Sequence, residues 1–254
     1  MRRLPAASRG SAVALTLALL AVWEGVVRLG WVSGAFLPAP TRVVASLGEL
    51  VASGELVTHL SITLARMLVA LIWGGGVGLL LGLALGTSAR LRALLDPLIA
   101  ALHPVPRMAL LPVVLLLFGI GFLSKAMVVA ISTFFPMVIN TMGGVREVDP
   151  NYLDAARLYG ASRRRIFWRV LLPASLPSIL TGVRLATTRA LGATIGLELI
   201  TAQSGIGSML FFAWQTYRAE DLYATVVVIA VLGSLFRAGI AVATRRLVPW
   251  RDGF

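Results

Sequence analysis

Six charged side chains interrupt otherwise apolar stretches of this sequence: Arg66, Arg107, Arg184, Arg189, Glu198 and Arg237. Of these, Arg66, Arg107, Arg184 and Glu198 are the candidates for contact with a polar solute. In hydrocarbon a charge costs at least ~2.5 kcal/mol unless it is paired or hydrated. Arginines facing a watery cavity would give it a positive potential, which favours a small anion. The alternative is structural, because the same groups could pair with each other or cap carbonyls freed by nearby prolines.

The residue types needed for catalysis are missing or badly spaced. The chain has no Cys, and its two histidines, His59 and His103, lack ligand-like spacing. No Ser/His/Asp arrangement lies at plausible mutual depth. The glycines around Gly74 and Gly78 lack the Lys of a phosphate-binding loop. We therefore expect no catalytic residue, no metal site and no cofactor bound by this chain, and we do not expect it to be an enzyme.

The composition indicates a membrane protein. Of 254 residues 58% are hydrophobic and 13% charged, and the mean hydropathy is +0.88. The formal charge of +12 comes from arginines in short gaps between apolar runs, which argues against nucleic acid as a partner. A span needs ~20 apolar residues. We predict an all-α integral membrane fold, one domain over residues 1–254, with spans at 11–31, 56–87, 98–118, 125–145, 178–200 and 222–242.

Two of these spans carry unusual residues. Gly74, Gly78, Gly82 and Gly86 recur every four residues and form one stripe, which predicts close packing against another helix. In the third span Pro104, Pro106 and Pro112 must break or kink the helix more than once. Irregular backbone at membrane depth requires protein or water beside it. Residues 103–111 are therefore a candidate pathway lining or a simple structural kink.

The connecting segments have their own signals. After Pro40, apolar residues at helical spacing predict a short amphipathic helix, and Arg90 with Arg92 indicates a polar turn. Pro173 and Pro177 are expected to introduce the fifth span.

Positive charges gather on one side of the predicted spans. This side holds both termini, Arg90, Arg92, Arg146 and the arginines of residues 151–169, whereas Arg28, Arg42, Lys125 and Arg218 fall on the other. The positive-inside rule then makes both termini and the 151–169 segment cytoplasmic.

The 151–169 segment has a specific pattern. Asp154-Ala155-Ala156 is followed by three residues, Gly160, nine residues and Val170-Leu171-Leu172-Pro173. The alanines offer a flat helix surface, and Asp154 near a helix start would suit its dipole. Gly160 permits the left-handed conformation that ends a helix. Pro173 would set where the next helix begins.

This pattern resembles the EAA loop of ABC importer permeases, with Asp154 in place of Glu and Val170 in place of Ile. Other pieces resemble the nitrate/sulfonate/taurine/bicarbonate group in the same order along nearly the whole chain, namely residues 37–40, 61–66, 104–112, 182–184, Glu198 with 205–207, and 245–251. The resemblance implies the type I ABC importer permease fold of about six helices with a cytoplasmic coupling helix.

The resemblance also implies partners and site residues. The partners would be two cytoplasmic ATP-binding subunits that carry ATP and Mg, a second copy of this chain, a periplasmic or lipid-anchored substrate-binding protein, and the lipid of a bacterial inner membrane. The residues expected to contact the ATPase are Asp154, Ala155, Ala156, Leu158, Tyr159, Gly160, Ala161 and Pro173. Candidate pathway residues are Arg66, Pro106, Arg107, Met108, Arg184 and Glu198, the last with the 205–207 loop at an outer gate.

Competing interpretations remain open at this point. The 151–169 segment could instead lie on lipid, where Arg163–Arg165 would meet anionic headgroups. The whole chain could be an ATP-independent secondary transporter or channel, since broken spans and buried charges occur there too. An intramembrane enzyme is the weakest alternative, for lack of catalytic residues.

Overall fold

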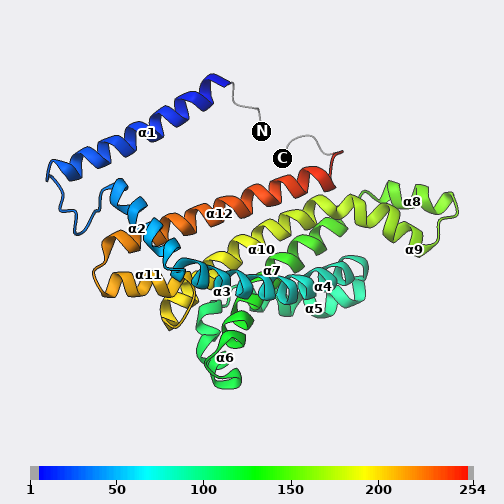
Figure 1. Ribbon diagram of the computed structural model, residues 1–254. Helices are drawn as coiled ribbons and strands as arrows, with labels where there is room; N and C mark the ends of the chain where they lie inside the picture. Colours follow the sequence, from blue (N-terminus) through cyan, green and yellow to red (C-terminus); the bar gives the residue numbers. More distant parts are fainter. Residues whose placement is uncertain (1–5, 251–254) are drawn as a thin grey trace. The chain divides into compact units, whose positions relative to one another are not determined.

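The computed structural model describes residues 6–250, and every regular element in that range is a helix (Figure 1). The described chain forms two compact units. The first comprises the described residues up to Thr63 together with Glu198–Leu232, and the second comprises Leu64–Leu197 with the described residues from Gly233 onward. The predicted all-α class is confirmed.

The helices are α1 Ala6–Arg28, α2 Pro40–Ala52, α3 Glu55–Ala70, α4 Gly76–Thr87, α5 Ala89–Leu102, α6 Leu111–Phe118, α7 Phe122–Arg146, α8 Pro150–Leu158, α9 Arg163–Ile166, α10 Leu172–Thr201, α11 Ile206–Gln215 and α12 Ala219–Leu247. Short π turns at Leu71–Gly75 and Phe167–Leu171 join α3 to α4 and α9 to α10. A helix therefore lies over each of the six predicted spans, although the boundaries differ.

Four continuous helices within the described residues are long and apolar enough to cross a membrane: Glu55–Thr87, Phe122–Arg146, Arg163–Thr201 and Ala219–Leu247. The pair Ala89–Leu102 and Arg107–Phe118 would make a fifth if it counts as one span. Helix α1 covers the first predicted span as far as Arg28 and is not one of these.

The predicted break in the third span is confirmed, and it is sharper than a kink. Helix α5 stops at Leu102, and the next helical segment leaves at 91° to it. Pro104 and Pro106 lack the N–H groups that would continue the ladder, and each restricts the residue before it. Helix α5 begins at Ala89, before the predicted start of this span at residue 98, and the predicted polar turn at Arg90 and Arg92 was wrong.

Both arginines of that supposed turn lie inside α5, which begins at Ala89. The side chain of Ser88 accepts a hydrogen bond from the Leu91 N–H at 3.3 Å, so Ser88 is the N-cap. Ser88 is thus the one residue between α4 and α5, and by capping α5 it lets the second helix begin at once. Arg90 is exposed, whereas Arg92 is half-buried and its Nη1 donates to the Leu85 carbonyl at 3.3 Å, so the two arginines lie in a helical turn rather than a loop.

The glycine stripe packs against α7, as predicted. A Cβ placed on Gly78 would lie 2.7 Å from the Phe134 carbonyl oxygen, and one on Gly82 would lie 2.7 Å from Cβ of Thr141. A Cβ on Gly86 would lie 2.5 Å from Cβ of Val145. No side chain fits between these backbones, so the glycines allow the two helices to touch.

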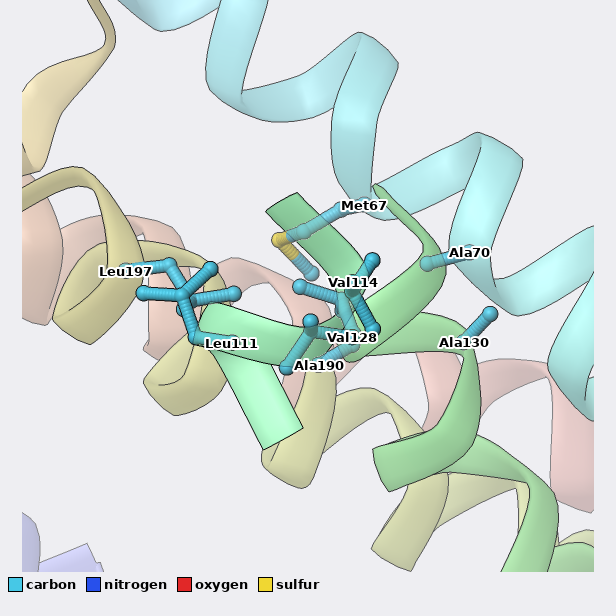
Figure 2. Close-up of a cluster of buried hydrophobic side chains, with 9 residues drawn as sticks. Met67, Ala70, Leu111, Val114, Val128, Ala130, Ala190 and Leu197 are labelled. Carbon is cyan, nitrogen blue, oxygen red and sulfur yellow. The ribbon is translucent and has the colours of Figure 1, made fainter. Parts of the chain in front are cut away.

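A hydrophobic cluster joins four of the segments in the second unit (Figure 2). Met67 and Ala70 from α3 pack with Val114 of α6, Val128 of α7 and Ala190 of α10. Each side chain is nearly inaccessible to solvent. The cluster holds the short helix α6 against the longer helices α3, α7 and α10.

The α-helical part of the fifth predicted span, α10, begins at Leu172 beside Pro173, but no break in the helical backbone marks this point. The helix runs without interruption from Arg163 to Thr201 and contains both Pro173 and Pro177. A π turn lies directly before Pro173, and wide turns of this kind absorb a register shift where the hydrogen-bond ladder is incomplete. The proline therefore lies inside a helix that extends well beyond residues 178–200.

In the first unit the predicted amphipathic helix is α2. Its buried residues are Val43, Ser46 and Leu50, while Val44 and Val51 are exposed. Val43 and Leu50 share a cluster with Met209 of α11. This packing fixes α2 to α11 within the unit.

Candidate functional site

The segment that resembles the EAA loop forms a two-helix projection in the second unit, where α8 and α9 precede α10 (Figure 1). Asp149 is the N-cap of α8, and its carboxylate accepts a hydrogen bond from the Asn151 N–H at 2.9 Å. Pro150 follows at the first helical position, where proline is favoured. Asp154 was expected near the helix start, but it lies in the second turn of α8.

Asp154 pairs with a neighbour on its own helix. Its Oδ1 accepts from Nη1 of Arg157 at 2.7 Å, and both side chains are more than half exposed. An exposed pair spaced three residues apart contributes little to stability. The pair leaves both charged groups accessible to another molecule.

Gly160 ends α8 in the left-handed conformation, with φ +72°, as predicted. The Gly160 N–H donates to the Arg157 carbonyl at 2.9 Å, and the Ala161 N–H donates to the Ala156 carbonyl at 3.0 Å. These two bonds form a Schellman motif, which satisfies carbonyls that the helix end would leave free. A Cβ added to Gly160 would meet nothing within 4 Å, so the constraint there is the backbone angle alone.

The end of α8 presents bare apolar side chains to the exterior. Leu158 is 88% exposed, Tyr159 91% and Tyr152 64%. Ala155 is also exposed, and Ala161 is half-buried. An apolar group of this size on a small projection is typical of an interaction surface. We call Tyr152, Ala155, Leu158 and Tyr159 the knob surface.

The opposite side of α8 is anchored to the protein. Leu153 packs with Val145, Val148 and Leu171, a cluster that connects the end of α7 with the π turn before α10. A force on the knob surface would therefore pass through Leu153 to two membrane-spanning helices. Sequence reasoning missed both Leu153 and Asp149, although the Asp149-Pro150 pair is a recognisable helix start.

A row of arginines borders the knob surface. Arg163, Arg164 and Arg165 form the first turn of α9, and all three are exposed, as is Arg169. Ser162 caps this helix by accepting a hydrogen bond from the Arg165 N–H. The resulting positive surface suits acidic side chains of a partner or anionic headgroups.

Among the candidate pathway residues, Arg107 caps a free carbonyl. Its Nη2 donates to the His103 oxygen at 2.6 Å, and its guanidinium lies 5.4 Å from the Phe135 ring centroid. His103 is the last residue before the proline break, so this carbonyl lost its helical partner. Pro106 is extended, and Cε of Met108 lies against Gly196 of α10.

The other two arginines differ in accessibility. Arg66 is only 2% exposed, and its guanidinium lies over the Phe122 ring at 5.5 Å. Arg184 is exposed and lines a cavity with Arg237 of α12, which sequence reasoning noted as an intramembrane charge but left out of the pathway. Arg107 is not among the residues lining that cavity.

Glu198 organises the loop before α11 within the first unit. Its carboxylate accepts hydrogen bonds from the Thr63 hydroxyl, at 2.8 and 3.0 Å, and from the Gly207 N–H at 3.1 Å. The Thr63 hydroxyl oxygen also accepts from the Ile206 N–H at 2.9 Å. Gly205 has φ +101°, and any Cβ there would overlap the Glu198 carboxylate. The carboxylate therefore holds the 205–207 loop from inside.

Comparison with known proteins agrees with this architecture. Residues 74–252 match the family described as "Binding-protein-dependent transport system inner membrane component". This chain belongs to that family. The permease is 35% identical over 94% of its length to the putative aliphatic sulfonates transport permease protein SsuC of Bacillus subtilis, covering 87% of that protein.

Two further relatives come from Escherichia coli. The taurine transport system permease protein TauC is 36% identical over 91% of this permease and 86% of its own length. The putative aliphatic sulfonates permease SsuC is 38% identical over 94% and 91%. A solved chain of the inward-facing MetNI methionine ABC transporter superposes with a TM-score of 0.61 over 74% of this permease and 91% of that chain. Its 18% identity supports the shared fold alone.

Proposed function

We propose that this permease forms the translocation pathway of an ATP-driven importer for a small organic sulfonate, and that separate cytoplasmic subunits hydrolyse the ATP. The observation that carries the proposal is the knob surface. Its apolar side chains stand on a helix that ends in a fixed Schellman turn, and Leu153 connects that helix to α7 and the start of α10. Such a rigid, anchored projection can transmit a push from a bound partner.

The chemistry of the motor is expected elsewhere. The sequence has no glycine-rich loop ending in Lys-Ser or Lys-Thr, which ATPases use to hold the phosphates. ATP and Mg would bind two partner subunits, each engaging one knob surface of a permease dimer. Closure of the ATPases would bring the knobs together and open the spans outward, which is alternating access.

The relatives and the charges support the proposed substrate class. The names of three relatives refer to aliphatic sulfonates or taurine, all of which carry a sulfonate group. Exposed arginines on predicted spans suit such an anion. A binding protein on the periplasmic side would deliver it, and the permease would lie in the inner membrane with both termini in the cytoplasm.

Co-purification with the ATP-binding subunit tests the coupling role. Gly160→Glu forces a side chain into the left-handed position, and Ala156→Asp puts a charge on the flat helix surface. We expect both variants to lose the ATPase and ATP-driven uptake while remaining in the membrane. Gly48→Glu is the matched control, because Gly48 lies exposed on α2 with open space around it.

The contrary result is equally clear. If both variants took up sulfonate normally in proteoliposomes that contain no ATPase, the permease would be an ATP-independent transporter.

A further inference from the structure

We propose that the cavity between α10 and α12 is a binding site for an organic anion with a short hydrocarbon part, and that Arg184 and Arg237 hold its acid group. This inference rests on the proposed function and adds to it the residues and the shape of the ligand. The inference also predicts that the cavity binds sulfonates that carry an alkyl chain more tightly than bare inorganic anions.

The cavity measures about 290 Å³ and belongs entirely to the second unit. Arg184 and Arg237 line it from opposite helices, and both side chains are exposed. No carboxylate lines the cavity, and among the described residues neither guanidinium forms an ion pair with an acid. Two cations on one small cavity repel each other, and an anion between them would remove that repulsion.

In the proposed topology both arginines lie at hydrocarbon depth. Arg237 is four residues, about 6 Å, from the middle of α12. Arg184 is two to three residues, or about 4 Å, from the middle of α10. In the proposed topology α10 leaves the cytoplasmic side and α12 returns to it, so both groups fall in the cytoplasmic half. An exposed charge at this depth requires water or a bound counter-charge.

The donors available in the cavity come from the guanidiniums. The Thr187 hydroxyl already donates to the Val183 carbonyl at 2.8 Å, and the Thr188 hydroxyl donates to the Arg184 carbonyl at 3.0 Å. Arginine presents its N–H groups as a planar fork that matches two oxygens of one acid group. A sulfonate has three oxygens, so two forks can engage it together.

The rest of the lining is apolar and suits the remainder of such a ligand. Leu185, Leu191, Phe236 and Ile240 complete most of the wall. A bare oxyanion such as sulfate would leave these side chains against water, whereas a short alkyl chain would cover them. Each buried methylene contributes about 0.8 kcal/mol, so affinity should rise with chain length until the cavity is full.

A binding measurement on the intact permease–ATPase complex tests the proposal. The complex is placed in nanodiscs of zwitterionic lipid, and binding of radiolabelled butane-1-sulfonate is measured without any binding protein. We expect Arg184→Gln and Arg237→Gln each to weaken binding by about tenfold or more, since each removes a charge-assisted contact. Arg237→Lys should retain part of the affinity, and unlabelled sulfate should compete far more weakly than ethanesulfonate or butane-1-sulfonate.

Arg189→Gln serves as the matched control. Arg189 is an exposed arginine on the same helix, and it does not line this cavity. Its variant should bind butane-1-sulfonate like the unchanged complex. Size-exclusion profiles and retention of the ATPase show that each variant is folded.

Three results would overturn the proposal. The first is unchanged butane-1-sulfonate binding in both glutamine variants. In the second, native mass spectrometry of complexes in phosphatidylglycerol nanodiscs finds an anionic lipid that both variants lose, and this lipid blocks sulfonate; the cavity would then be a headgroup site. In the third, the variants dissociate the permease dimer without changing sulfonate affinity, which would assign the arginines to a subunit interface.

The uptake assay separates this inference from the proposed function. If the unchanged complex shows no ATP-dependent sulfonate uptake, the proposed function fails. If it shows uptake and the two glutamine variants match it in both uptake and binding, only the cavity assignment fails.

Discussion

At the scale of single residues, Leu158 and Gly160 have separate roles in the same turn. Gly160 allows the backbone to reverse, while Leu158 is 88% exposed and contributes little to the protein's own packing. An interaction surface would explain why so apolar a group is left in water. The two residues can therefore be distinguished by substitution.

Leu158→Asp should weaken binding of the ATP-binding subunit by about tenfold or more without lowering the thermal stability of the permease, because a charge would be desolvated at the contact. Pull-down titration and thermal unfolding measure the two effects. Tyr217→Asp is the control, since Tyr217 is also 88% exposed but lies at the other end of the predicted spans. Equal loss in both variants would argue against a specific contact at Leu158.

Thr63 offers a second test at this scale. Thr63→Val removes the hydroxyl that accepts from the Ile206 N–H and donates to Glu198, leaving a buried donor unpaired at a cost of about 1–3 kcal/mol. We expect faster hydrogen exchange at Ile206 and Gly207. Thr58→Val, on the same helix, removes only an exposed bond to the Gly54 carbonyl and should leave the loop protected. Unchanged exchange in Thr63→Val would mean that the Thr63 hydroxyl does not order the loop.

At the scale of elements, the contact between α4 and α7 depends on the absence of side chains. The α7 residues that face the glycine stripe have no room to retreat, because they belong to buried clusters of their own. An added methyl group should therefore lower the stability on the side of α4 that faces α7, but not on the side that faces away from it.

Gly78→Ala should destabilise the permease by about 1–3 kcal/mol, because its Cβ would lie 2.7 Å from the Phe134 carbonyl oxygen. Gly76→Ala should instead be neutral or stabilising by up to about 1 kcal/mol, since nothing lies within 4 Å and alanine favours helix. Thermal unfolding in detergent compares them. Similar stability in both variants would show that the α4 and α7 backbones are not in contact.

At the scale of the whole molecule, the absence of cysteine makes topology directly measurable. Single-cysteine variants Tyr159→Cys and Tyr217→Cys place one thiol at each predicted side of the membrane, both on well-exposed positions. The positive-inside rule predicts that a membrane-impermeant maleimide labels Tyr217→Cys in intact spheroplasts, and Tyr159→Cys only after permeabilisation. Labelling of Tyr159→Cys from outside would overturn both the orientation and the coupling role.

Much of the fold could be predicted from local patterns. Apolar length predicted where the long helices lie, and the intervals between Gly74, Gly78, Gly82 and Gly86 predicted a tight helix contact, because both properties depend on residue type and spacing alone. Gly160 likewise predicted a helix end in the left-handed conformation, since glycine has no Cβ that would clash there.

Contacts between residues that lie far apart in the sequence could be found only from the tertiary structure. Leu153 anchors α8 by packing against Val145 and Leu171. The π turn before Pro173 and the Arg107 bond to the His103 carbonyl are local features that the sequence pattern did not reveal. Arg184 and Arg237 are far apart in sequence, and only the packing of α10 beside α12 brings them to one cavity. Side-chain spacing along one helix is set by its geometry, whereas the pairing of two helices is set by the packing of the whole unit.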